Sequence, residues 1–466
     1  MASSFSYLFS LVSLLSLFPF SYPSTNTTIK LSLTPLLIPT TPLYKNTSLL
    51  NHLTTSSLAR AKQLKTPQLT KTPLFPRSYG GYSVSLSFGT PPQVLDFVMD
   101  TGSSLVWFPC THLYLCSQCD FPNIDPGNIT TFLPKSSSSS KVLGCKDPKC
   151  GLLFGPNVQT RCQGCDGTSV NCPQNCPDYV VEYGSGTTAG LLLSDTLVFS
   201  NSSVNDFVVG CSIFSDSQPC GIAGFGRGPA SLPAQMGLKK FSYCLVSHRF
   251  DDKPETSELV LFRGYAGDRF GGGVRYTPFI NPTNTNPAYQ DYYYVSLRKI
   301  TVGGVHVKVP FKFLEPAADG NGGTIVDSGT TFTYLDHEVY ELVAQEFEKQ
   351  MRNYSRAKDV ETRAGLRPCY NITGKKPMVV PDLFFHFKGG VKVEFPLADY
   401  FSIVGDESNV VCMTMVSSSV NVNDIGGAGG ATEGPSIIIG NYQQQNFYVE
   451  YDLEKKRIGF RKQICK

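Results

Sequence analysis

The chain has 466 residues, long enough for two lobes that each bury a core, which excludes a small disulfide-stapled scaffold. Charged residues make up 17%, below the roughly 25% of an average soluble domain, while glycine, proline, tyrosine and phenylalanine are abundant, which favours a β-rich protein with many turns. The net charge of +3 gives no support to nucleic-acid binding, which needs a clustered basic face.

The first residues indicate export. Leu8 to Phe20 form an apolar run followed by small and polar residues, which predicts a secretory signal peptide over residues 1–24. The alternatives are a buried core helix or a short membrane anchor, but this run is too short to span a bilayer comfortably and no other apolar run approaches about 18 residues. We therefore expect no stable membrane anchor and entry into the secretory pathway.

Residues 25–78 are predicted to be a basic prosegment. They are rich in Pro, Thr, Ser and Leu, show no sustained alternation of apolar and polar residues, and contain no cysteine. Residues 1–78 carry seven basic residues, from Lys30 to Arg77, and no acidic one, so the remainder of the chain has 33 basic and 37 acidic residues.

The rest of the chain contains the same pattern twice, a strand and then an apolar run that leads to an acidic residue. Tyr82 to Leu86 is a period-2 strand, and after a Gly-Thr-Pro-Pro turn the apolar run Phe97 to Met99 leads to an acidic residue. Tyr293 to Leu297 is again a strand, and Gly323 to Val326 again leads to an acidic residue, so we expect two related lobes. Further short strands are expected at residues 191–199, 259–262 and 447–451, and a core-packed helix after the N-cap residue Asp336.

The cysteines indicate an oxidising compartment. There are 15, all after residue 109, and nine crowd between Cys110 and Cys176. The C-x-x-C pairs that begin at Cys116 and Cys162 could hold zinc, but the export signal favours a disulfide-stapled insertion. Spacing leaves the connectivity open, and the odd total leaves at least one cysteine free or intermolecular. Glycosylation sequons lie at Asn26, Asn46, Asn128, Asn201, Asn353 and Asn371.

Two short motifs carry the chemistry, one in each half of the chain. They are Asp100-Thr-Gly-Ser-Ser104 and Asp327-Ser-Gly-Thr-Thr331, each following an apolar strand. A lone Asp-Thr-Gly is usually a turn in which the aspartate caps backbone N–H groups. Two copies at matching positions of a repeat favour a paired site. The matching apolar-apolar-Gly segments that follow are Gly221 to Gly224 and Ile437 to Gly440.

With these pieces the chain, from Tyr79 to Cys465, is similar to the pepsin-like (family A1) aspartic proteases. The cysteine-rich insertion after Trp107 and the ending Gly440 to Gln445 resemble the plant, nepenthesin-like branch. The resemblance implies an all-β, two-lobed fold with an interlobe cleft and a few short helices. The N-terminal lobe would span residues 79–280 with the cysteine-rich insertion, and the C-terminal lobe residues 281–466.

Paired carboxylates have a direct chemical use. Like charges about 3 Å apart cannot both ionise cheaply, so Asp100 and Asp327 would hold one proton between them. The ionised member is a general base for a water molecule, and the protonated member donates to the scissile carbonyl oxygen. This reaction needs no metal, cofactor or covalent intermediate. Gly102 and Gly329 lack side chains, so their backbones can approach the carboxylates and offer N–H donors.

The resemblance also assigns supporting roles. Ser103 and Thr330 would hydrogen-bond the outer carboxylate oxygens, and Thr101 and Ser328 would tie the two loops together, with Ser328 standing where Thr is commoner. Further roles are a flap tyrosine at Tyr183 next to Gly184, an indole at Trp107 that reaches this tyrosine, and disulfides Cys369–Cys412 and Cys244–Cys465.

The resulting prediction is an aspartic endopeptidase, a hydrolase made as a zymogen, with an acid optimum and protein or peptide substrates, acting as a monomer. The basic prosegment is hypothesised to cover the acidic cleft at neutral pH and to leave in acid. Two alternatives remain open: a catalytically silent binding protein on the same fold that inhibits microbial glycan-degrading enzymes, and a structural glycoprotein of the cell wall.

Overall fold

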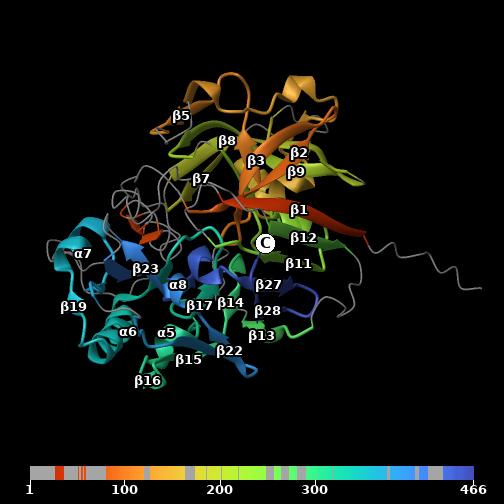
Figure 1. Cartoon of the computed structure of the whole chain (residues 1–466). Coiled ribbons are helices and arrows are strands. Elements are labelled where there is room, and N and C mark those ends of the chain that lie inside the picture. The colour runs from red at the N-terminus through yellow and green to blue at the C-terminus, as the bar shows by residue number, and fades with distance from the viewer. Residues whose placement is uncertain are drawn as a thin grey trace, which may run out of the picture.

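The computed structural model confirms the all-β, two-lobed architecture (Figure 1). It describes residues 27–35, 51, 54–55, 57–58 and 80–465, except 120–125, 163–173, 185, 201, 219, 248–256, 264–271, 281–289, 319, 375–377, 405–408 and 418–433. The predicted signal peptide, Asn26, Asn46 and Asn201 lie outside the described residues. No helix in the described ranges is long and apolar enough to cross a membrane.

The N-terminal lobe is built on a long hairpin of β8 and β9. The two strands pair from Thr187↔Asp216 to Phe199↔Ser202, and β2, β4, β5, β6 and β7 add to them. Strands of this lobe are β2 (Tyr82–Phe88), β3 (Gln93–Asp100), β4 (Trp107–Pro109), β5 (Leu115–Ser117), β6 (Lys141–Val142), β7 (Tyr179–Tyr183), β8 (Gly186–Phe199), β9 (Ser202–Asp216) and β10 (Gly221–Gly224). Its helices are η2 (Pro126–Asn128), η3 (Pro134–Ser136), η4 (Pro148–Cys150), α2 (Gly151–Phe154), η5 (Val158–Arg161) and α3 (Leu232–Gln235).

The C-terminal lobe carries the longest described helix. The Asp336 side chain accepts from Glu338 N and begins α6, whose apolar face is buried, as its spacing predicts. Strands of this lobe are β14 (Tyr294–Val295), β15 (Leu297–Val302), β16 (Val305–Val307), β17 (Thr324–Val326), β18 (Thr333–Leu335), β19 (Ser355–Arg356), β20 (Cys369–Asn371), β21 (Leu383–Phe387), β22 (Val391–Glu394), β23 (Phe401–Val404), β24 (Val410–Met413), β25 (Met415–Val416) and β26 (Ile437–Ile439). Its helices are α5 (Phe311–Leu314), α6 (His337–Gln350), α7 (Lys358–Ala364), α8 (Leu397–Tyr400) and η8 (Asn441–Gln444).

An antiparallel sheet joins the lobes. Its central pairing, β11 with β27, runs from Lys240↔Asp452 to Cys244↔Tyr448, and the Cys244–Cys465 disulfide closes one end. Lys240 is buried there and forms ion pairs with Glu450 at 3.1 Å and Asp452 at 3.6 Å. The other strands of this sheet are β12 (Ser257–Arg263), β13 (Arg275–Ile280) and β28 (Arg457–Lys462), with β11 spanning Lys240–Cys244 and β27 spanning Phe447–Asp452.

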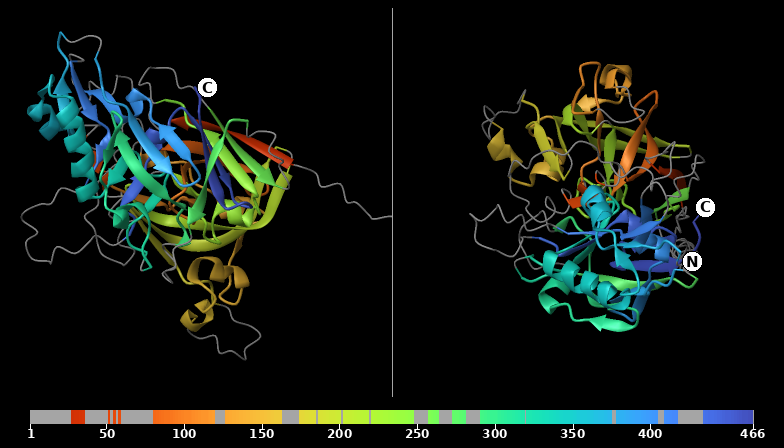
Figure 2. Two further views of the ribbon diagram at one scale, coloured as in Figure 1. Left: turned by 90° about the horizontal axis from the view of Figure 1, so that it is seen from below. Right: turned by 60° about the vertical axis from the view of Figure 1, so that its left-hand side comes forward.

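A strand from the predicted prosegment also belongs to this sheet. β1 (Thr27–Pro35) pairs antiparallel with β12 over seven residues and then with the first residues of β2. Figure 1 shows it (red) beside β12 between the lobes, and the left view of Figure 2 shows the same neighbours. The sequence analysis saw no sustained alternation in this region, yet Ile29, Leu31 and Leu33 do alternate with polar residues. The expectation failed because the alternation is confined to six residues inside a Pro- and Thr-rich segment.

Disulfides account for nearly all described cysteines. The two cysteines of the first candidate zinc pair, Cys116 and Cys119, are bonded to each other. In the second candidate pair, Cys162 is bonded to Cys145. Among the described cysteines only Cys220 is free. The remaining described disulfides are Cys110–Cys211, Cys150–Cys176, Cys244–Cys465 and Cys369–Cys412.

Candidate active site

Each motif lies at the end of a buried strand, and a second strand pairs in parallel with that strand. β3 ends at Asp100 and pairs in parallel with β10, where Gly224 lies opposite Asp100, and Phe225 N donates to Asp100 O at 2.7 Å. β17 leads to Asp327 and pairs in parallel with β26, and Asp327 N donates to Ile439 O at 3.0 Å. The two lobes therefore present their aspartates in the same local structure.

The hydrogen bonds around the two carboxylates match atom for atom. Gly102 N donates to Asp100 Oδ1 at 2.8 Å, and the Ser103 hydroxyl donates to Oδ2 at 2.5 Å. In the other lobe Gly329 N donates to Asp327 Oδ1 at 2.9 Å, and the Thr330 hydroxyl donates to Oδ2 at 2.6 Å. Such donors stabilise a carboxylate and fix its orientation.

The carboxylates of both lobes meet at Gly329. Its N–H donates to Asp327, and a Cβ built on its Cα would overlap the Asp100 carboxylate. Only glycine permits this approach, because any side chain would displace the carboxylate of the opposite lobe. Asp100 is 2% exposed and Asp327 is 0% exposed, so the pair is shielded from bulk water in the full-length chain.

A symmetric pair of hydrogen bonds ties the loops together. Thr101 N donates to Ser328 Oγ at 3.1 Å, and Ser328 N donates to Thr101 Oγ1 at 2.8 Å. Each hydroxyl also donates to a strand carbonyl of the opposite lobe, Ser328 to Met99 at 2.9 Å and Thr101 to Val326 at 3.3 Å. Ser328 therefore makes the same set of bonds as Thr101, and the missing methyl group removes none of them.

The expected flap pair also lies together. β7 ends at Tyr183, and Gly184 follows in the turn that leads to β8. Trp107 Nε1 donates to the Tyr183 hydroxyl at 2.9 Å, and the indole is 0% exposed. The hydrogen bond joins the flap to β4, the strand that follows the Asp100 loop.

Two supporting residues were missed by the sequence analysis. Gln444 donates to Asp327 O at 3.3 Å and to Ile439 O at 2.9 Å, and its Oε1 accepts from the Tyr243 hydroxyl at 2.5 Å. Burial raises the pKa of Tyr243, so this hydroxyl remains a donor. Asn441 donates to Ser328 O at 3.0 Å. These residues entered the sequence analysis only as markers of a plant branch, although a buried polar run beside an apolar strand is itself a signal.

The other expected site residues are placed as follows. Cys369 lies opposite Cys412 on neighbouring strands, β20 and β24, and the two are disulfide-bonded. The sequon residues Asn128, Asn353 and Asn371 are exposed. No cluster of three or more metal-ligating side chains occurs in the described part of the chain.

Two family models match the chain, "Xylanase inhibitor N-terminal" over residues 82–262 and "Xylanase inhibitor C-terminal" over residues 292–462. A probable aspartyl protease of Arabidopsis thaliana is 32% identical over 82% of both chains. The aspartic proteinase nepenthesin-2 of Nepenthes gracilis is 33% identical over 82% of this chain and 77% of that protein. The crystal structure of edgp has a TM-score of 0.59 at 20% identity and covers 82% of this chain and 92% of that chain.

The chain therefore belongs to the pepsin-like aspartic protease family, in the plant branch that includes the nepenthesins. The family expected from the two motifs is confirmed.

Proposed function

We propose that the chain is an aspartic endopeptidase active in acid. The observation that carries the proposal is the matched bonding of Asp100 and Asp327, from two lobes, with Gly329 in contact with both carboxylates. Equivalent environments let the two acids share one proton, so that one is a base while the other is an acid.

The chemistry follows from this shared proton. The ionised carboxylate takes a proton from a water molecule, whose oxygen attacks the peptide carbonyl, while the protonated acid donates to the carbonyl oxygen. The carboxyl that took the water proton then donates it to the leaving nitrogen, the other carboxylate takes a proton from a hydroxyl of the gem-diol, and the C–N bond breaks to give an acid and an amine, with one proton left on the pair. Substrate would lie extended in the interlobe cleft below Tyr183, held by backbone hydrogen bonds.

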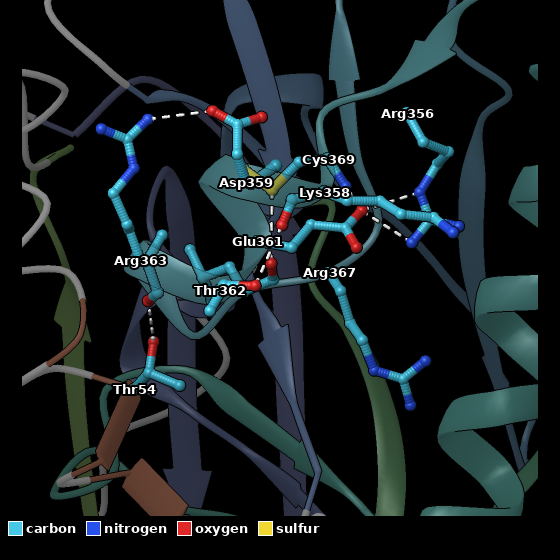
Figure 3. The surroundings of a disulfide bond; sticks show 12 residues. Thr54, Arg356, Lys358, Asp359, Glu361, Thr362, Arg363, Arg367 and Cys369 are labelled. Atoms are coloured by element: carbon cyan, nitrogen blue, oxygen red, sulfur yellow. Dashed lines mark hydrogen bonds and ion pairs between the residues drawn. A yellow bond between two sulfur atoms is a disulfide. The ribbon is translucent and has the colours of Figure 1, made fainter.

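We further propose that residues 25–78 form a prosegment that holds the enzyme inactive. Besides β1, Thr54, Ser57 and Leu58 of this segment contact the C-terminal lobe. Phe332 N, five residues after Asp327, donates to the Ser57 hydroxyl at 2.9 Å, and Leu58 packs against the buried cluster that contains Phe332. The Thr54 hydroxyl contacts Ala364 O at 3.5 Å, and Figure 3 shows Thr54 beside α7. Ser57 and Thr54 are both buried, which supports a close-fitting leader.

The basic residues that follow Leu58, beginning with Arg60 and Lys62, lie outside the described residues. In the proposal, one of them reaches the carboxylate pair at neutral pH and is released when the pair becomes protonated in acid. Self-cleavage of the purified full chain should then begin only on acidification. Release that is equally fast at neutral and acid pH would reject this mechanism.

The proposal includes secretion. The apolar run near the N-terminus, the sequons and the disulfides support passage through an oxidising compartment, ending in the cell wall, outside the cell or in the vacuole. Glycans would be attached at exposed sequons such as Asn128, Asn353 and Asn371. The enzyme would act as a monomer on protein or peptide substrates.

A second candidate is a binding protein that inhibits glycan-degrading enzymes. It is favoured by the description of the two family models, and basic 7S globulin from soybean shares the fold with a TM-score of 0.58 at 19% identity. The protein fold alone does not separate the candidates.

The deciding experiment uses the acid-processed chain in two assays. The first measures cleavage of an unfolded protein in acid with and without pepstatin, and the second measures inhibition of a microbial xylanase. Pepstatin-sensitive cleavage without xylanase inhibition is the expected result. Xylanase inhibition without cleavage would replace the protease proposal with the binding-protein candidate.

A further inference from the structure

A short segment of the C-terminal lobe, Asp291 to Val295, contacts the backbone that supports each catalytic loop. These supports are the residues that follow β10, for the Asp100 loop, and strand β17, for the Asp327 loop. On one side Arg227 N donates to Asp291 O at 2.9 Å, and the Tyr293 hydroxyl donates to Phe225 O at 2.8 Å. Residues 225–228 directly follow β10, and the N–H groups of Phe225 and Gly226 donate to backbone carbonyls of the Asp100 loop. The segment therefore reaches across from the C-terminal lobe to the support of Asp100.

On its other side the segment holds the strand that leads to Asp327. β14, Tyr294–Val295, pairs antiparallel with β17, and Val326 N donates to Tyr293 O at 3.3 Å. Val326 immediately precedes Asp327. A displacement of this segment would therefore shift one catalytic loop relative to the other, because it is bonded to the supports of both.

The Asp291 side chain extends this contact into the Asp100 loop itself. The Asp291 carboxylate and the Ser104 hydroxyl lie next to each other beside Gly228, and the Ser104 hydroxyl accepts from Gly228 N at 3.1 Å. A Cβ at Gly228 would overlap both the Asp291 carboxylate and the Ser104 hydroxyl, so these two side chains leave room only for glycine at position 228. Ser104 follows Ser103, whose hydroxyl donates to Asp100 and whose carbonyl accepts from Gly226 N at 2.8 Å.

The charges around Asp291 are few. Burial raises the pKa of Asp291 to about 6, opposed by the Ser104 hydroxyl and the Arg227 guanidinium. Burial lowers the pKa of Arg227, opposed by Tyr293 and Asp291. Within the described residues these are the titratable groups that act on Asp291, Arg227 from the N-terminal lobe and Tyr293 from its own segment. In acid Asp291 is therefore a neutral carboxylic acid, and its carbonyl oxygen is able to accept from the neighbouring Ser104 hydroxyl.

We propose that Asp291 is a positioning residue of the aspartic dyad: by holding Ser104 from the opposite lobe, it fixes the Asp100 loop relative to Asp327. This inference rests on the proposed protease function. Asp291 touches neither substrate nor the reacting atoms, and it acts through Ser104 and Ser103 on the orientation of the Asp100 carboxylate.

The test compares Asp291→Ala, Ser104→Ala, the double variant and Asp291→Asn, all as processed enzyme at pH 4. Either alanine variant should lower kcat about 10- to 100-fold with KM changed less than twofold, because misplacement of a reacting group affects the transition state more than substrate binding. The double variant should be no slower than the slower single variant. Asp291→Asn should stay within about threefold of the wild type, because asparagine offers the same acceptor oxygen without charge. Asp359→Ala on α7, whose carboxylate is exposed and pairs with Arg363, is the matched control and should not change kcat or KM.

A second readout does not depend on activity. Hydrogen–deuterium exchange of a peptide spanning residues 100–106 should be faster in Asp291→Ala than in the wild type, and unchanged in Asp291→Asn and Asp359→Ala. Unaltered kcat and unaltered exchange in Asp291→Ala would overturn the inference, as would an equal loss in the Asn variant. If the wild type cleaves nothing, the protease function fails, and the exchange measurement alone decides whether Asp291 positions the loop.

Discussion

At the residue scale, the site is a set of short, repeated hydrogen bonds around two carboxylates. Its core was predictable because the Asp-Thr/Ser-Gly-Ser/Thr order places each donor two or three residues after its acceptor. Gln444 and Asp291 were not predictable in this way. Gln444 bonds Asp327 across 117 residues of sequence, and Asp291 meets Ser104 from the opposite lobe, so only the folded chain brings them together.

The hydrogen bond between Trp107 and Tyr183 gives a prediction at this scale. Tyr183→Phe removes the hydroxyl that accepts from Trp107 Nε1 and leaves a buried indole N–H without this acceptor, at a cost of about 1–3 kcal/mol. We expect kcat/KM for an unfolded protein or peptide in acid to fall about tenfold, since roughly 1.4 kcal/mol corresponds to a factor of ten. Tyr354→Phe, which also removes a hydroxyl that accepts a backbone N–H, is the control and should not alter the kinetics. A Tyr183→Phe enzyme as active as the wild type would show that the bond does not hold the flap.

At the element scale, several strands were predictable from short apolar patterns: those expected over residues 82–86, 259–262 and 447–451 lie within β2, β12 and β27. β1 was missed because its alternating residues lie inside a Pro- and Thr-rich segment. The single strand expected at 293–297 is divided, since Ser296 separates β14 from β15. Pairing across the lobes decides such boundaries, and this information is not local in the sequence.

The interlobe sheet contains a buried charge whose loss should be costly. Lys240→Met leaves Glu450 and Asp452 buried without their shared cation, and we expect a loss of about 3 kcal/mol in the free energy of unfolding. The neighbouring Lys239 forms an exposed pair with Glu454, so Lys239→Met should cost no more than about 1 kcal/mol. Denaturant unfolding of both variants measures the difference. Equal effects of the two substitutions would contradict this account of the sheet.

β1 gives a second prediction at this scale. If processing occurs before Tyr79, only three residues precede β2, too few to replace the seven pairings that β1 makes with β12. We therefore expect a peptide containing residues 27–35 to stay bound after activation, because its loss would expose the edge of β12. Size-exclusion chromatography in acid followed by mass spectrometry should find this peptide with the enzyme, and denaturant should release it. Its absence from active enzyme would show that another segment covers the edge.

At the scale of the whole molecule, buried carboxyl groups favour stability in acid. Asp399 is 0% exposed, its side-chain oxygens have no hydrogen-bond partner among the described residues, and burial raises its pKa to about 8, opposed by Lys462. A raised pKa in the folded state means that its stabilising contribution is full below about pH 4 and is lost as the pH rises through about 8.

Asp399→Asn should remove this dependence on pH. The free energy of unfolding at pH 8 should rise by about 1–3 kcal/mol relative to the wild type, with little change at pH 4. Thermal or denaturant unfolding at the two pH values measures it, and Asp359→Asn, an exposed acid, is the control. A shift of the same size at both pH values would show that the ionisation of Asp399 is not the cause.

The central claim is that Asp100 and Asp327 act as one unit. The most direct measurement is kcat/KM of the processed enzyme in acid for Asp100→Asn, Asp327→Asn and the double variant. Each single substitution should lower kcat/KM by about 10³-fold or more, and the double variant should be no worse than the lower single variant, because one proton is shared by the pair. Pepstatin-sensitive cleavage that survives within tenfold in either single variant would contradict the account.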